Sequence, residues 1–371
     1  MIRYSEQYID ETDIEGIIKT LKSDYLTQGP LLETFEDILA KSTRTNYAAC
    51  VSSATAALHL TYLAAGMSPE KLIWTVANTF VATASAAVYC GAQVDFVDIE
   101  LKNYSICVKD FLRKLRNAER IPDYLVVVHF SGRAVDLSSI AKICKQYGIT
   151  IIEDASHALG AECRNKKVGE CEYSLATIFS FHPVKTITTA EGGGITSNNQ
   201  ELIETIKKLR SHSVESDTSV PWYKKQNSIG YNYRMTELQA SLGITQSEKL
   251  LKFQNIRKKQ AQYYFAELSN LNIYLPNNDS VGSISSWHLF VIRDRVTNEK
   301  TRNSKMKELI KRNIGVNLHY FPLYRLSTLQ RNISDFPKNE EYFKSAFSLP
   351  LSLKMTESQQ SYIIDNMKKL F

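Results

Sequence analysis

Two residues of the chain have the types and positions needed for chemistry between an amine and a carbonyl group. Asp154 closes the apolar run ITIIED, and Lys185 follows the apolar run that ends at Phe181. Residues 186–194 (TITTAEGGG) give Lys185 a small, hydroxylic and glycine-rich setting, in which a lysine loses its proton more readily and forms an imine. A carboxylate at the end of a strand can pair with a protonated ring nitrogen, as a pyridoxal cofactor requires. The alternatives are a surface lysine beside a glycine turn and an aspartate that caps a helix.

A possible anion site lies between the first strand-like run and the helical segment that follows it. Ser53, Ala54 and Thr55 stand at this junction. Backbone N–H groups at the start of a helix, together with short hydroxyl side chains, bind phosphate groups. Ordinary helix capping by Ser53 or Thr55 is compatible with this role. Ser180 could add a further hydroxyl group to the same phosphate.

Two more side chains have positions from which they could contact a planar cofactor. Phe80 opens the helical segment after the run LIWTV, and an aromatic ring there could stack on a flat ligand or pack in the core. His157 follows Asp154 by three residues. It could pack on the ring or bond its hydroxyl group, and a purely structural histidine is equally compatible.

The order of the elements predicts an α/β fold. Strand-like and helix-like segments alternate from residue 45 to about residue 200, which indicates βαβ units and a mostly parallel sheet covered by helices. Ligands bind such sheets beyond the carboxyl ends of their strands, where Asp154 and Lys185 stand. The apolar runs are residues 48–51, 72–76, 94–97, 125–130, 149–152 and 175–181, and the helical segments are residues 54–66, 79–90 and 136–147.

The second half of the chain predicts a smaller α+β unit behind a long helical connector. The connector pattern covers residues 235–270. We expect a large domain with an N-terminal arm at residues 1–250 and a small C-terminal domain at residues 251–371. The polar segment 213–228, which carries Pro221, predicts a mobile loop. Beyond the connector, strand-like runs occupy residues 287–292 and 314–319, and helical patterns occupy residues 303–312 and 356–369.

Composition argues against several classes of protein. Hydrophobic residues make up 43% and charged residues 23% of the chain, as in ordinary globular proteins with a large core. The 45 basic and 39 acidic residues leave a net charge of +6 that is spread along the chain, which suits an anionic substrate better than nucleic acid. No apolar run is long enough to span a membrane, and the N-terminus lacks the pattern of a signal peptide. The six cysteines lack the spacing of a metal site, so we expect reduced thiols and a cytoplasmic protein.

These segments together resemble the DegT/StrS family of nucleotide-sugar aminotransferases over nearly the whole chain. The resemblance implies the type I fold of aspartate aminotransferase, with pyridoxal 5′-phosphate (PLP) bound by the large domain. The block at residues 179–194 is the most specific part. The segments that carry the resemblance are LTQGP (26–30), SSATAALHL (52–60), NTFVATA (78–84), EDASHALGA (153–161), FSFHPVKTITTAEGGG (179–194) and GYNYRMTELQASLG (230–243).

The resemblance implies a role for each of these residues. Lys185 is then the catalytic lysine that bonds PLP as a Schiff base, Asp154 pairs with the pyridine nitrogen, and Phe80 stacks on the ring. Asn232 would reach the phosphate of the neighbouring subunit, which implies a homodimer with composite active sites. The residues implied to hold the phosphate in the same chain are Ala54, Thr55 and Ser180.

A finer resemblance points to the transaminases of pseudaminic acid biosynthesis. It rests on His157, where many relatives carry Gln, and on PWYKKQ (221–226), GVNLHYFPLY (315–324) and SLPL (348–351). Such enzymes move the amino group of L-glutamate to C4 of UDP-2-acetamido-2,6-dideoxy-β-L-arabino-hexos-4-ulose, a precursor of a sugar found on flagella and surface polysaccharides. The candidate substrate contacts on this pattern are Tyr4, Thr27, His319 and Tyr320.

Two positions depart from the family pattern, and three other functions remain open. Ser213 stands where relatives have Gly, and Phe321 replaces a Lys found in some of them. The acceptor could be another UDP- or dTDP-linked 4-keto-6-deoxy sugar, of the bacillosamine, perosamine or viosamine type. A dehydratase of the family would carry His in place of Lys185. A non-catalytic regulator would need a DNA-binding region, for which the first 25 residues are too short.

Overall fold

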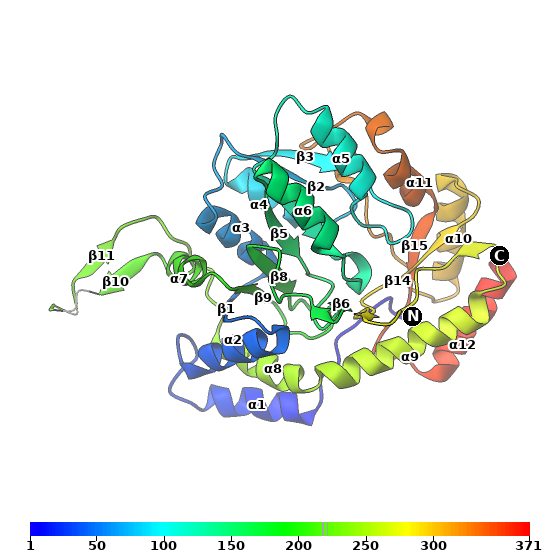
Figure 1. The fold of residues 1–371 in the computed structure, drawn as a ribbon. Helices are drawn as coiled ribbons and strands as arrows, with labels where there is room; N and C mark the ends of the chain where they lie inside the picture. Colours follow the sequence, from blue (N-terminus) through cyan, green and yellow to red (C-terminus); the bar gives the residue numbers. More distant parts are fainter. Residues whose placement is uncertain (217–218, 221) are drawn as a thin grey trace.

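The computed structural model describes residues 1–216, 219–220 and 222–371, and its centre is a seven-stranded sheet (Figure 1). Five neighbouring strands of the sheet are parallel, and β9 runs antiparallel to both of its neighbours, β1 and β8. The predicted α/β class is therefore confirmed. The strands lie in the order β1 (Tyr47–Val51), β9 (Gly193–Ser197), β8 (Ala176–Ser180), β5 (Thr150–Asp154), β4 (Tyr124–Val128), β2 (Leu72–Val76) and β3 (Gln93–Val97).

Helices bury both faces of this sheet, which explains why its strands are largely apolar. Alternate residues of one strand enter different cores: Val126 packs in one cluster, and Leu125 and Val127 pack in another on the opposite face. The first face is covered by α3 (Ala54–Ala64), α4 (Ala82–Tyr89) and α7 (Gln200–Leu209). The other face is covered by α2 (Pro30–Thr43), α5 (Val108–Arg116), α6 (Leu137–Tyr147) and α8 (Glu237–Glu248).

The long helical pattern predicted for residues 235–270 is divided between two helices. Helix α8 begins after the capping residue Thr236, and α9 (Leu250–Leu268) begins directly after Lys249. The ammonium group of Lys249 lies 2.7 Å from the Asp10 carboxylate and 2.6 Å from that of Asp13. This break lets α8 pack against α1 (Glu11–Leu21) while α9 leads to the C-terminal part, where it lies beside α12 (Figure 1).

The C-terminal part has a core of its own around a three-stranded antiparallel sheet. We propose the domain boundary at residue 250, as the sequence predicts. The strand prediction for residues 314–319 is wrong: Ile314 and Asn317 make only isolated bridges, to Ile2 and Ser348. The elements are β12 (Ile273–Tyr274), β14 (Phe290–Asp294), β15 (Ala346–Leu349), α10 (Glu299–Lys311), α11 (Pro337–Ser345) and α12 (Glu357–Leu370).

The N-terminal arm crosses to this C-terminal part. The N–H of Gly315 donates to the Ile2 carbonyl at 2.7 Å, and the N–H of Leu351 donates to the Tyr4 carbonyl at 3.0 Å. The first residues of the chain are thereby held beside residues more than 300 positions away. Smaller elements complete the fold: β6 (Glu162–Cys163), β7 (Lys166–Lys167), β13 (Ser283–Ile284) and the 3-10 helices at Phe130–Gly132, Leu323–Arg325 and Ile333–Asp335.

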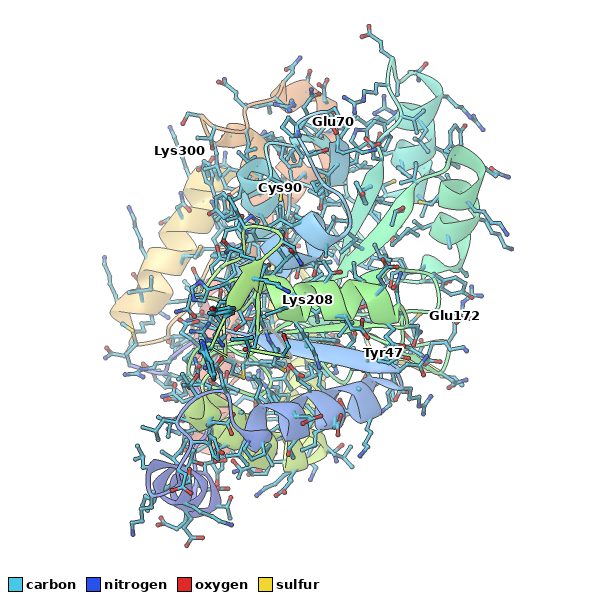
Figure 2. The ribbon with its side chains drawn as sticks, turned by 90° about the vertical axis from the view of Figure 1, so that its left-hand side faces the viewer. Tyr47, Glu70, Cys90, Glu172, Lys208 and Lys300 are labelled. Carbon is cyan, nitrogen blue, oxygen red and sulfur yellow. The ribbon has the colours of Figure 1, made fainter. Side chains whose placement is uncertain are left out.

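A two-stranded hairpin projects from the body beyond α7 (Figure 1). It pairs β10 (Val214–Ser216) with β11 (Lys224–Gln226), so the loop predicted for residues 213–228 contains regular structure. Pro221, on which that prediction rested, lies outside the described residues. Lys208, at the end of α7 (Figure 2), holds the base of the hairpin through Glu215 at 2.8 Å. Across the described residues, none of the helices has the length and apolar character that a membrane crossing needs.

Candidate active site

A cavity of about 500 Å³ lies beyond the carboxyl ends of the parallel strands and collects most of the predicted site residues. Its walls come from the large domain, the N-terminal arm and the C-terminal part. Thr27 and Asn232 are not among its lining residues. The predicted residues that line it are Tyr4, Ala54, Thr55, Phe80, Asp154, His157, Ser180, Lys185, His319 and Tyr320.

Lys185 reaches this cavity from a tight turn after β8. Its N–H donates to the His182 carbonyl at 2.9 Å, and the buried hydroxyl of Thr188 donates to the Phe181 carbonyl at 3.0 Å. Burial lowers the pKa of Lys185 to about 8, and the charge of Asp154 opposes part of that shift. A large fraction of the Lys185 amine is therefore neutral near pH 8, as nucleophilic and basic chemistry requires.

The carboxylate of Asp154 is buried at the end of β5 and is bound from two sides. One oxygen accepts a hydrogen bond from the Thr83 hydroxyl at 2.6 Å. The other accepts from the hydroxyl and the N–H of Ser156, at 2.6 and 3.1 Å. These donors fix the orientation of the carboxylate, which still borders the cavity. Asp154 therefore does more than cap the segment that follows it.

The N-terminus of α3 faces the cavity and has the properties of a phosphate site. The Ser53 hydroxyl accepts a hydrogen bond from the Ala56 N–H at 3.1 Å, while the main chain at Ala54 and Thr55 borders the cavity. A Cβ atom on Gly193 would lie 2.4 Å from the Ser53 carbonyl oxygen, so only glycine lets β9 approach the helix this closely. Ser180 pairs with Gly193 across the sheet, which places its hydroxyl beside the same helix end.

Three buried histidines and Tyr320 form another wall of the cavity. The Nε2 atom of His157 lies 2.9 Å from the Tyr320 hydroxyl, and the His288 ring lies 4.4 Å from the His157 ring. Burial lowers the pKa of His157 and of His288 well below the usual value, and it lowers the pKa of His319 to about 3. All three imidazoles are therefore neutral. Phe80 is half exposed and lies against Tyr320 with the ring centres 6.0 Å apart.

Sequence reasoning missed His288 and Thr83. His288 belongs to the run WHLFVI, which was assigned to a strand, but β14 begins only at Phe290. Trp287 adopts a φ of 49°, and this left-handed residue turns the His288 ring towards His157. The Nδ1 atom of His288 is buried and has no hydrogen-bond partner within the part of the chain that the structure describes. Thr83 lay inside NTFVATA, and only the observed contact with Asp154 distinguishes it from a core residue.

Thr27 and Asn232 are exposed and lie outside the cavity lining. Thr27 forms an isolated bridge with Thr236, and Asn232 forms one with Ser211. A role of Asn232 in a neighbouring subunit requires this exposure, whereas Thr27, the predicted substrate contact, does not line the cavity of its own chain. Ser213, beside this segment, has a φ of 52°, a left-handed conformation that glycine adopts most readily.

Phe321, the other departure from the family pattern, lies outside the cavity lining as well. Its ring is half exposed and packs edge-on against Phe343, with the ring centres 5.5 Å apart. The C-terminal part therefore holds this position by aromatic packing, where some relatives carry a charged lysine.

Comparison with known proteins assigns the chain to a family. The model of the DegT/DnrJ/EryC1/StrS aminotransferase family matches residues 7–368. The chain belongs to this family. This aminotransferase is 36% identical over 371 residues, covering 99% of the chain and 96% of its relative, to a Campylobacter jejuni protein named UDP-4-amino-4,6-dideoxy-N-acetyl-beta-L-altrosamine transaminase.

Two solved structures have the same fold as this aminotransferase over its whole length. A putative sugar aminotransferase of Streptococcus pneumoniae, Spr1654 in its PMP form, superposes with a TM-score of 0.94 at 26% identity, covering 100% of this chain and 99% of the other. Helicobacter pylori PseC, described as an aminotransferase of pseudaminic acid biosynthesis, superposes with a TM-score of 0.90 at 30% identity, with the same coverage. The predicted type I fold is confirmed.

PLP is the cofactor of this aminotransferase, and the residues of the cavity fit it. An amine with a lowered pKa, a fixed carboxylate and a helix N-terminus match the aldehyde, the ring nitrogen and the phosphate of PLP. Gly193 places no side chain against the start of α3, where an added Cβ would lie 2.6 Å from the Ala54 nitrogen. The family and the site therefore agree on an enzyme that transfers amino groups.

Proposed function

We propose that this aminotransferase moves the amino group of L-glutamate to C4 of UDP-2-acetamido-2,6-dideoxy-β-L-arabino-hexos-4-ulose. The product would be UDP-4-amino-4,6-dideoxy-N-acetyl-β-L-altrosamine, on the route to pseudaminic acid. The observation that carries the proposal is full-length similarity at 36% identity to a transaminase named for this product. The Lys185 turn and the carboxylate of Asp154 support catalysis, and the family's dehydratases would have His in place of this lysine.

The residues of the cavity have distinct tasks in this reaction. PLP supplies the electron sink that stabilises negative charge on the reacting carbon. Lys185 would hold the cofactor through its Nζ atom, and after glutamate has displaced that amine, the freed Nζ would move the proton from the α-carbon of glutamate. Asp154 keeps the ring nitrogen protonated, and Thr83 and Ser156 hold its carboxylate in place. The phosphate would be bound by Ala54, Thr55 and Ser180, with Phe80 and His157 beside the ring.

We further propose that the active form is a homodimer with composite sites. Asn232 would contribute to the phosphate site of the neighbouring subunit, and Thr27 would contact the substrate there. Both side chains are exposed and outside their own chain's cavity, which supports a task in a second copy. Tyr4, His319 and Tyr320 are the proposed sugar contacts from the same chain. Their place in the cavity depends on the N-terminal arm and the C-terminal part.

A substrate panel tests the proposal. The purified protein, loaded with PLP and supplied with glutamate, is offered UDP- and dTDP-linked 4-keto-6-deoxy sugars, and products are identified by mass spectrometry and NMR. We expect the C4 amine of the β-L-arabino substrate, with the altrosamine configuration, to form fastest, and Lys185→Ala to form none. Faster amination of a bacillosamine, perosamine or viosamine precursor would contradict the proposed sugar. Stoichiometric binding of sugar without turnover would favour a regulator.

A further inference from the structure

We propose that the Tyr320 hydroxyl is a fixed hydrogen-bond donor for an oxygen atom of the acceptor sugar, and that the backbone N–H of Ser131 sets its direction through His157. The inference rests on the proposed function, because it names the part of the substrate that contacts this wall. It makes Ser131 and His157 positioning residues for Tyr320.

The chain of hydrogen bonds that orients the Tyr320 hydroxyl begins at a strained turn after β4. Ser131 has a φ of 59°, and its N–H donates to Nδ1 of His157 at 3.2 Å. Its carbonyl accepts a hydrogen bond from the Leu289 N–H at 3.1 Å. Gly132, with a φ of 96°, packs so tightly that an added Cβ would lie 2.8 Å from the backbone nitrogen of His288. Non-glycine residues rarely keep a left-handed conformation unless several contacts hold them in it. The two hydrogen bonds of Ser131 and the tight packing at Gly132 hold Ser131 in this way.

This N–H decides where the single proton of His157 lies. Burial keeps the imidazole neutral, and the nearby positive charge of Lys185 acts in the same direction. A neutral imidazole has one N–H and one bare nitrogen. Because Nδ1 accepts from Ser131, the proton is on Nε2. Nε2 then donates to the Tyr320 oxygen, 2.9 Å away.

Tyr320 must therefore donate its own proton elsewhere. Burial raises the pKa of its phenol, and the negative charge of Asp154 raises it further, so the hydroxyl stays protonated. Within the described residues, His157 is the hydrogen-bond partner of this hydroxyl. The backbone of Tyr320 is held by Asn78, whose side-chain oxygen accepts the Tyr320 N–H at 3.2 Å. The hydroxyl of Tyr320 can therefore donate a hydrogen bond to a ligand oxygen in the cavity, which Tyr320 lines.

The part of the cavity wall around Tyr320 favours an uncharged oxygen atom of the ligand over a charged one. Its neighbours His157, His288 and His319 carry no charge, and Lys185 is the only Lys or Arg among the described residues that line the cavity. A carboxylate or phosphate is bound best by a cation or a helix N-terminus, and the α3 terminus supplies the latter at another wall. A hydroxyl or carbonyl oxygen of a sugar needs a single neutral donor, which the Tyr320 phenol provides.

The two half-reactions, followed separately by the absorbance of the bound cofactor, test this assignment. One begins with glutamate and the PLP form, and the other with the 4-keto sugar and the aminated form. For each variant we compare the rate constant of the sugar half-reaction with that of the glutamate half-reaction. In Tyr320→Phe we expect the ratio of the first to the second to fall roughly 10- to 100-fold, as for loss of one oriented hydrogen-bond donor. His157→Leu should lower the same ratio. His157→Gln should restore it to within about threefold of wild type, because an amide accepts from Ser131 and donates to Tyr320.

Three results would overturn the inference: an unchanged ratio in Tyr320→Phe, an equal loss in both half-reactions, or a His157→Gln variant no better than His157→Leu. Thermal unfolding of each variant separates a folding defect from the effect on the sugar. If wild-type protein shows no glutamate-dependent change in absorbance, the proposed function has failed instead. The two failures are therefore distinguishable.

Discussion

The hydroxyl of Thr83 donates to the Asp154 carboxylate across 2.6 Å, and the Thr79 hydroxyl lies 2.8 Å from that of Thr83. Thr83 has one hydroxyl proton, which Asp154 receives, so Thr79 must donate to Thr83. The three side chains form a directed chain from the start of α4 to the end of β5. The carboxylate that borders the cavity is therefore held by a side chain of α4.

Replacing Thr83 by Val removes this donor while keeping the shape of the side chain. A hydrogen bond to a charged group contributes about 1.5–3 kcal/mol, so we expect PLP to bind roughly 10- to 100-fold more weakly. Titration of the apo-protein with PLP measures the effect. Thr83→Ser, which keeps the hydroxyl, is the matched control and should stay close to wild type. Equal affinities for the Val and Ser variants would show that the contact does not orient Asp154.

The reactivity of Lys185 should follow its lowered pKa. Only the neutral amine attacks an aldehyde, so the rate at which apo-protein bonds PLP should rise with pH and reach half its maximum near pH 8. Asp154→Asn removes the charge that raises this pKa, and it should move the midpoint to lower pH. Stopped-flow absorbance measures the rate. A midpoint near the ordinary value of 10.5 would show that Lys185 is not desolvated.

Gly193 and Gly194 allow a comparison between two neighbouring positions. A Cβ on Gly193 would lie 2.4 Å from the Ser53 carbonyl, whereas one on Gly194 would lie 2.5 Å from a Leu39 methyl group and near the Phe181 ring. Each Ala substitution should destabilise the fold by about 1–3 kcal/mol, as overpacking does. Only Gly193→Ala displaces the start of α3, so it should also weaken the binding of inorganic phosphate and PLP. Similar phosphate affinities in both variants would contradict a phosphate site at this helix.

Composite sites predict complementation between two inactive variants. Lys185→Ala lacks its own lysine, and Asn232→Ala lacks the residue that we assign to the neighbour's phosphate. A mixed dimer has one site with both natural residues. Random exchange makes half of the dimers mixed, so activity should recover to about a quarter of wild type. Mixing after mild dissociation, followed by an activity assay, measures this. No recovery from a mixture that contains mixed dimers would contradict the assignment of Asn232.

The sequence predicted the parts of the site that depend on local pattern. Asp154 and Lys185 follow apolar strands, and the carboxyl ends of neighbouring strands meet at one edge, so their approach follows from the order of elements. The start of α3 could be predicted equally well, because Ser53 is an ordinary capping residue at a junction between strand and helix.

The sequence did not predict the parts that depend on distant backbone geometry. His288 enters the cavity because Trp287 adopts a left-handed conformation, which a bulky apolar residue rarely does and no local pattern indicates. The helix break at Lys249 depends on Asp10 and Asp13, more than 200 residues earlier in the chain. The proton direction at Tyr320 depends on the Ser131 N–H, which only the three-dimensional structure brings to His157.

The most direct test of the account is the site of covalent attachment of PLP. Apo-protein is saturated with PLP and reduced with borohydride, and its peptides are mapped by mass spectrometry. We predict one phosphopyridoxyl group, on Lys185, and none in Lys185→Ala. A wild-type protein that carries no such group, or that carries it at another lysine, would contradict the account.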